Sequence, residues 1–235
     1  MGYLTRVFSA TEEENRRAVL AALPNGHGGA LLDLGVSDGE FTLRVAERVR
    51  ADAVHGVELL PDHAERARAR GVDTVLGDVE EGLPFEDRSF DVVHSNQLIE
   101  HLRHTDVFLS EIRRVLKPGG LACISTNNLS SWHNVFLLAL GMQPAPMHVS
   151  DRVIVGNPLN PEQGAGHADR GRIHVRLFTG RALCELCAFH GLRRRELRTA
   201  GYYPLPPRLA RAALRIDPLH GAYLIGLFSP DGATA

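Results

Sequence analysis

The sequence has few cysteines and no long apolar run, and these absences exclude several classes of protein. Its three cysteines among 235 residues are too sparse, and odd in number, for a disulfide framework. The longest apolar runs, such as VFLLAL at residues 135–140, are far shorter than the roughly 20 residues that a membrane-spanning helix needs. The N-terminal residues contain no apolar signal core. We therefore expect a soluble, cytoplasmic protein with free thiols and no stable membrane insertion.

An excess of charge of one sign is also missing. Lysine and arginine number 26 and aspartate and glutamate 28, which gives a formal net charge of -2. A nucleic-acid-binding protein normally carries a strongly basic surface, so we predict no nucleic-acid partner. With 44% hydrophobic residues the chain is long enough for one well-buried core. This predicts a single domain over residues 1–235 and leaves its oligomeric state open.

Strands and helices alternate from residue 30 to residue 128. Thr11, followed by three glutamates, predicts the N-cap of a preceding helix that ends at Pro24. Helical patterns separate five short apolar runs, and KPGG predicts a turn before the last of them. The predicted strands are ALLDLGV, AVHGVEL, TVLGD, SFDVVHSN and LACISTN. This alternation indicates an α/β fold, a parallel sheet with helices on both faces.

Residues 129–177 break the alternation. They are rich in proline, glycine and histidine and contain one predicted helix, so we expect a lid over a substrate site. Thr179 then predicts an N-cap, and two further strands follow before the end of the chain. Cys184 and Cys187 form a CxxC pair within this last helical pattern. Because both fall on its apolar face, we predict core thiols and not a redox or metal pair.

The stretch LLDLGVSDGEF, residues 31–41, joins a strand to a helix through a glycine turn. In a parallel sheet, ligands bind beyond the carboxyl ends of the strands, and such a turn forms the floor of the site. Asp33, Glu58 and Asp78 come at the ends of three successive predicted strands. Three acids suit a ligand with an ammonium group, a ribose and a base. A dinucleotide such as NAD is disfavoured, because the G-x-G-x-x-G fingerprint is absent.

Four stretches together resemble the class I S-adenosylmethionine-dependent methyltransferases, in the type 11 subgroup related to small-molecule and quinone-pathway enzymes. They are LLDLGVSDGEF, HGVELLPDHAERARARG, GDVEEGLPFEDRSFDVVHSNQLIEHL and EIRRVLKPGGLACISTNN. The resemblance implies a Rossmann-like sheet of seven strands. Its last strand, AYLIGLF, should be antiparallel and inserted between the fifth and sixth, with the lid after the fifth. It also implies that S-adenosylmethionine is the cofactor and a small molecule the methyl acceptor.

The resemblance also implies which residues bind the cofactor. Those expected around its methionine part are Asp33, Gly35, Ser37 and Gly39. Glu58 is expected to bind the ribose, Leu59 to lie beside the adenine, and Asp78 and Val79 to contact the adenine edge; Asn96 and Gln97 should border the transferred methyl group. Ser37 departs from the family, which usually has glycine there. Serine fits the turn only with a negative φ or at a cost in strain, so a weakened cofactor site is the alternative.

Methyl transfer from a sulfonium is an in-line displacement, and a base is needed only when the acceptor must lose a proton. Among the 12 histidines, His101, His133 and His174 are the candidate bases, each with a structural role as the alternative. Their number favours O-methylation over N- or C-methylation. No tight ligand spacing links His148, Asp151, His167 and Asp169, so no metal site is predicted. An NAD-type oxidoreductase and a non-catalytic protein that binds S-adenosylmethionine are the remaining alternatives.

Overall fold

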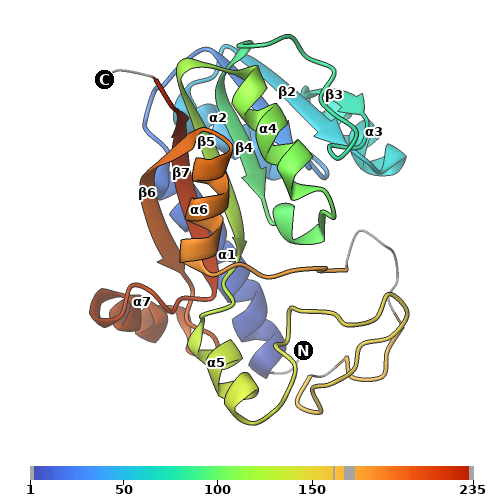
Figure 1. Ribbon diagram of the computed structural model, residues 1–235, viewed down its shortest axis with the longest axis vertical. Coiled ribbons are helices and arrows are strands. Elements are labelled where there is room, and N and C mark those ends of the chain that lie inside the picture. Colours follow the sequence, from blue (N-terminus) through green and yellow to red (C-terminus); the bar gives the residue numbers. More distant parts are fainter. Residues whose placement is uncertain (1–2, 161, 167–172, 233–235) are drawn as a thin grey trace.

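One seven-stranded sheet organises the chain (Figure 1). The computed structural model describes residues 3–160, 162–166 and 173–232. The strand order is β3-β2-β1-β4-β5-β7-β6, and β7 is antiparallel to both of its neighbours. The predicted fold class, including the position and direction of the last strand, is therefore confirmed. The strands are β1 (Ala30–Leu34), β2 (Ala53–Glu58), β3 (Asp73–Leu76), β4 (Phe90–Asn96), β5 (Leu116–Asn127), β6 (Leu192–Ala200) and β7 (Tyr223–Pro230).

Helices cover both faces of this sheet, as the sequence predicted. Side chains of a strand alternate between its two faces, so Leu31 and Leu32 of β1 enter different cores. Leu32 packs in the core that α4 and α6 cover, and Leu31 in the core that α1 and α2 cover. The helices are α1 (Tyr3–Ala22), α2 (Glu40–Val49), α3 (Pro61–Ala69), the 3-10 helix η1 (Ile99–His101), α4 (Thr105–Val115), α5 (Trp132–Ala139), α6 (Gly180–Phe189) and α7 (Pro207–Ile216).

Two local predictions were wrong. Thr11 is not an N-cap but a buried residue inside α1, which begins at Tyr3 because no glycine or proline interrupts residues 3–10. The predicted KPGG turn is part of the long strand β5. A Cβ on Gly120 would lie 2.9 Å from the carbonyl oxygen of Lys117, so glycine permits a close backbone approach here. The register of β4 against β5 shifts at the same place.

The predictions for α6 are confirmed. The Thr179 hydroxyl accepts a hydrogen bond from the backbone N–H of Ala182 at 3.2 Å, which caps the helix. Cys187 is fully buried in the core on this face, and Cys184 packs against that core; both are free thiols. Burial raises the pKa of the Cys187 thiol. These cysteines therefore belong to the packing of α6.

The segment after β5 begins with α5, which lies at one end of the sheet; α7 lies at the same end (Figure 1). Asp217, at the end of α7, accepts hydrogen bonds from Trp132 Nε1 at 2.5 Å and from the Tyr202 hydroxyl at 2.7 Å. These bonds connect α5 to the chain on both sides of α7. None of the described helices combines the length and apolar character needed to cross a membrane.

Candidate cofactor and active site

The turn between β1 and α2 has an unusual backbone. Gly35 and Gly39 have φ angles of 78° and 81°, and Ser37 between them has a φ of 52°. A Cβ on Gly39 would lie 3.1 Å from the Ala67 Cα, so the turn packs closely against α3. Ser37 thus adopts the left-handed conformation that serine occupies only with strain, on the order of 1–2 kcal/mol.

Glu58, at the end of β2, holds this turn through its carboxylate. Glu58 Oε2 accepts the backbone N–H of Ser37 at 2.8 Å, and Oε1 accepts that of Leu60 at 3.0 Å. The residue is only 7% exposed. Two charge-assisted bonds of this kind fix the carboxylate and compensate for the strain at Ser37. The acid predicted to bind a ribose therefore stands between two loops at the carboxyl end of the sheet.

Asp33 lies deeper than its predicted role requires. It is 3% exposed, and both of its oxygens have partners. Thr42 Oγ1 donates to Oδ2 at 2.5 Å, and His94 Nδ1 lies 2.7 Å from Oδ1. These bonds link β1 to α2 and β4. Its contact with a ligand ammonium group stays a prediction.

The three residues predicted near an adenine differ in exposure. Leu59 is 57% exposed, which is unusual for a leucine beside a buried acid. Asp78 follows β3, and its Oδ1 accepts the backbone N–H of Glu80 at 2.9 Å. The side chain of Val79 packs in the core, so only its backbone could reach a ligand edge. Leu59 is thus the apolar surface available to a flat ring.

Asn96 and Gln97, at the end of β4, belong to a polar chain that reaches α1. Asn15 Nδ2 donates to Asn96 Oδ1 at 2.8 Å, and Ser125 Oγ donates to Asn15 Oδ1 at 2.8 Å. The Gln97 side-chain amide lies 3.1 Å from Ser125 Oγ. Gln97 has a φ of 55°, a second non-glycine residue in the left-handed region. Hydrogen bonds of Asn15 therefore connect α1 to the carboxyl ends of β4 and β5.

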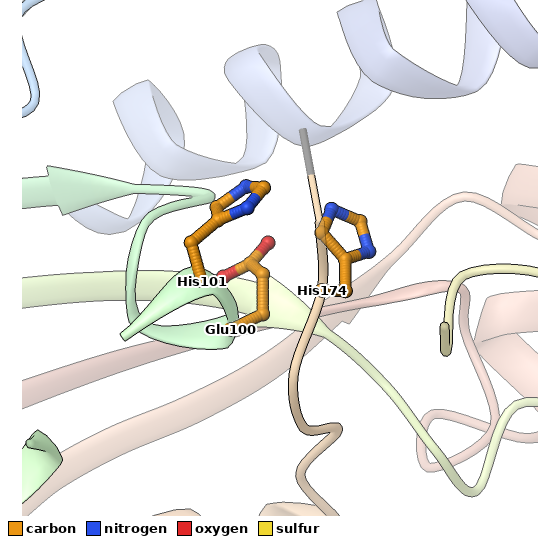
Figure 2. Close-up of side chains that lie close together, drawn as sticks. All are labelled: Glu100, His101 and His174. Carbon is orange, nitrogen blue, oxygen red and sulfur yellow. The ribbon is translucent and has the colours of Figure 1, made fainter. Parts of the chain in front are cut away.

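Two of the predicted bases, His101 and His174, come together in space. Their ring centroids are 4.5 Å apart, and Glu100 lies beside both (Figure 2). Glu100 and His101 belong to η1, and His174 to the extended segment before α6. Glu100 Oε2 accepts from Thr126 Oγ1 at 2.8 Å and Oε1 from Asn127 Nδ2 at 3.1 Å. A carboxylate and two imidazoles thus converge beside the end of β5.

Burial dominates the electrostatics of this cluster. Glu100 is 0% exposed, and burial raises its pKa to about 7 although Thr126 and Asn127 donate to it. Burial and the neighbouring His101 lower the pKa of His174 to about 3. At neutral pH the imidazole of His174 is therefore uncharged, the form that can accept a proton or bind a metal.

His133, the third predicted base, lies in α5 with other neighbours. Its Nε2 is 3.4 Å from Ser131 Oγ, and its ring makes an edge contact with Tyr203. Burial lowers the pKa of His133 to about 4. The roles of all three histidines as bases stay predictions.

The lowered pKa of His133 predicts a loss of stability in acid. An unfolded histidine titrates near 6.5, so between that pH and about 4 the unfolded chain binds a proton that the folded chain excludes. The contribution is complete above pH 6.5 and is lost as the pH falls. Between pH 8 and pH 5, we expect the free energy of unfolding of His133→Gln to fall by about 1–2 kcal/mol less than that of the parent protein.

Urea unfolding of both proteins at pH 8, 6.5 and 5 measures this difference. Glu100 and His174 also make the free energy of unfolding depend on pH, Glu100 in the opposite direction and His174 in the same direction as His133. Both contributions are present in the two proteins, so they cancel when the proteins are compared at the same pH. Equal pH dependence in both proteins would show that His133 is solvated when folded.

Sequence reasoning missed two residues that the structure places at the site. Glu100 directly precedes His101 in the apolar stretch QLIEHL, and an acid in such a stretch was a usable signal. Asn15 carried no comparable signal, because its partners Asn96 and Ser125 are 81 and 110 residues away. His167 and Asp169, considered as metal ligands, lie outside the described residues.

A wide cleft of about 850 Å³ lies between the loop after β3 and α4. Of the predicted cofactor residues only Asp78 lines it, together with side chains such as Glu81, Asp106 and Glu111. Glu58 and the glycine turn are not among its walls. The cleft therefore adjoins the candidate cofactor site at Asp78 but does not include the groups that hold the glycine turn.

Comparison with known proteins agrees with this geometry. A family model described as a methyltransferase domain matches residues 32–124, which run from within β1 into β5. Over these residues the chain is similar to a methyltransferase domain. The resemblance seen in the sequence is thereby confirmed. The matched part of the chain contains every predicted cofactor residue and His101, whereas His133 and His174 lie beyond it.

Curated relatives match part of the chain. The biotin biosynthesis bifunctional protein BioHC of Cellvibrio japonicus is 37% identical over 100 residues, 41% of this chain and 19% of the relative. The fatty-acid O-methyltransferase of Mycolicibacterium smegmatis is 32% identical over 122 residues, 48% of this chain and 44% of the relative. The chain thus spans less than half the length of these relatives.

The likeness in fold extends over nearly the whole chain. A solved S-adenosylmethionine-dependent methyltransferase from Thermotoga maritima superposes with a TM-score of 0.60, over 95% of this chain and 90% of the other. The two sequences are 20% identical, so this likeness concerns the fold alone.

Proposed function

We propose that the protein transfers a methyl group from S-adenosylmethionine to an oxygen atom of a small-molecule acceptor. The observation that carries the proposal is the position of Glu58, held by the amides of Ser37 and Leu60 beside the exposed Leu59. A carboxylate and an adjacent apolar surface suit a ribose and its base. When bound there, the cofactor supplies an activated methyl group.

Backbone strain supports the same location. Among the described residues, four non-glycine residues have a positive φ, and two of them are Ser37 and Gln97. Strain of this kind concentrates where a chain binds a ligand, because the surrounding structure must hold it. In the proposal, Ser37 and Gly39 present backbone to the methionine part, and Asn96 and Gln97 border the methyl group.

Transfer to oxygen is supported by the cluster at η1. An acceptor hydroxyl is a weak nucleophile until its proton moves to a base. The neighbouring Glu100 and His101 can accept that proton, whereas the lowered pKa of His174 makes its imidazole a weaker base. The fatty-acid O-methyltransferase among the relatives acts on an oxygen by its name. N- or C-methylation is the alternative, and it requires no base of this kind when the acceptor is already nucleophilic.

An acceptor with an apolar part fits the proposed lid, residues 129–177. The helix α5 within it exposes Phe136, Leu138 and Leu140. A cluster of exposed apolar side chains marks a binding surface more often than a single exposed apolar side chain does. Aliphatic carboxylic acids and phenols are therefore the first acceptors to test.

The proposal predicts stoichiometric binding of S-adenosylmethionine and transfer of its methyl group. Calorimetry measures the binding, with NAD as the comparison ligand. A labelled methyl donor then reports transfer to a panel of aliphatic acids, phenols and amines. Transfer to acids or phenols supports O-methylation, and transfer to amines alone supports the alternative. Tight binding of NAD with no binding of S-adenosylmethionine would overturn the proposal, and cofactor binding without transfer to any acceptor would indicate a non-catalytic protein.

A further inference from the structure

We propose that Glu100, His101 and His174 bind a divalent transition-metal ion. One ligand atom from each residue lies within 4.8 Å of the other two, and the side chains point toward one another (Figure 2). Two imidazoles and a carboxylate are a ligand set suited to zinc, iron, cobalt and nickel. The sequence predicted no metal site, because the residues weighed as ligands there were His148, Asp151, His167 and Asp169 and not Glu100.

The hydrogen bonds of the two histidines fix the tautomer that metal-bound histidines usually have. His101 Nδ1 lies 3.1 Å from the Ile173 carbonyl oxygen, and His174 Nδ1 lies 2.6 Å from that of Pro146. A carbonyl oxygen only accepts, so each Nδ1 carries the proton. In the neutral rings the lone pair is then on Nε2. Metal-bound histidines usually show this pattern, with the second nitrogen donating to a carbonyl or carboxylate.

Glu100 is oriented for the same purpose. Thr126 and Asn127 donate to its two oxygens, which fixes the plane of the carboxylate. Four lone-pair directions are available on a carboxylate, so these two bonds and the Gln97 amide, 3.1 Å from Oε1, leave capacity for an ion. A fully buried carboxylate is costly without a positive partner, and its hydrogen-bond donors Thr126 and Asn127 are both uncharged. A bound cation would remove that cost.

The third ligand is held in place by the backbone. The Glu100 carbonyl oxygen accepts the N–H of Val175 at 2.9 Å, directly after His174. The Arg176 guanidinium donates to the Arg103 carbonyl oxygen at 2.8 Å and to Thr105 Oγ1 at 3.2 Å. The segment carrying His174 is thus attached on both sides of η1. Such attachment lowers the entropy that would be lost on assembling the site around an ion.

Small movements would complete the coordination sphere. Metal bonds to imidazole and carboxylate are about 2.0–2.2 Å long, so the ligand atoms must approach to about 3 Å of one another. Three protein ligands leave positions for water or a substrate. The Gln97 amide is 3.1 Å from Glu100 Oε1, so the site borders the residues expected near the methyl group. A role in holding the acceptor oxygen rests on the proposed function, whereas metal binding does not.

Titration of the metal alone tests the site. Protein freed of metal with a chelator is titrated with Co²⁺, whose absorption reports nitrogen and oxygen ligands, and with Zn²⁺ by calorimetry. We expect one ion per chain, with affinity lowered at least about 10-fold in His174→Ala, His101→Gln and Glu100→Gln. His27→Ala, which removes an exposed histidine far from η1 in the sequence, is the matched control and should bind as the parent does. Magnesium should bind more weakly, because it prefers oxygen ligands.

The outcomes separate the site from adventitious binding. Circular dichroism and melting curves without metal establish that each variant is folded, and any one folded variant of the three suffices. No stoichiometric binding, or equal affinity in the His27→Ala control and the folded site variants, would overturn the proposal. Because neither methyl donor nor acceptor is present, that result would leave the proposed methyl transfer untouched. Failure to bind S-adenosylmethionine would in turn leave the metal site standing.

Discussion

Replacing Glu58 by alanine is expected to weaken S-adenosylmethionine binding at least about 100-fold, equivalent to about 2.7 kcal/mol. The substitution removes the acceptor for the ribose hydroxyls, and hydrogen bonds to a charged group are worth about 1.5–3 kcal/mol each. It also releases the N–H groups of Ser37 and Leu60, which the carboxylate now holds at 2.8 and 3.0 Å. The strained turn would then relax away from the ligand. Calorimetric titration measures the loss directly.

Two further variants show whether the carboxylate itself is responsible. Glu65→Ala removes an exposed acid from α3 and should leave the affinity unchanged. Glu58→Gln keeps an acceptor oxygen but loses the charge, so we expect an intermediate affinity. If Glu58→Ala bound the cofactor as tightly as the parent protein, the cofactor position proposed here would be wrong.

The regular part of the fold was predictable because its signals are local. Buried parallel strands are short apolar runs, and Thr179 caps α6 where a hydroxyl precedes a helical pattern. The antiparallel position of β7 came from the family resemblance and from no local pattern. The start of α1 was missed because Thr11 followed by three glutamates is also a valid cap signal, and only the tertiary contacts of the helix decide between the two.

The site was predictable only where it lies on strand ends. Asp33 and Glu58 lie near the ends of β1 and β2 and Asp78 follows β3, and the parallel topology brings such positions to one edge. The contact between Glu100 and His174 depends instead on how the segment after α5 returns to η1. No periodicity encodes that return. Sequence reasoning could name His101 and His174 as candidates, but their contact is visible only in three dimensions.

Replacing Phe108 by alanine is expected to lower the free energy of unfolding by about 4 kcal/mol. Phe108 is 0% exposed and is among the largest fully buried side chains of the molecule. It lies in the core between the sheet and the pair of helices α4 and α6. Removing the ring forfeits its transfer free energy and leaves a cavity that the rigid sheet cannot fill. Urea unfolding at pH 7.5 measures the change.

The same core packs against the proposed active site, so we expect Phe108→Ala to disturb the positions of residues in that site. Ile99, which begins η1, and Phe178, near the end of the segment that carries His174, belong to the same core cluster as Phe108. Val107→Ala, on the same helix but 39% exposed, is the control and should change stability by less than about 0.5 kcal/mol. Phe108→Leu refills much of the volume and should recover most of the loss. If Phe108→Ala were no less stable than Val107→Ala, the packing that positions Glu100 against His174 would have to come from elsewhere in the fold.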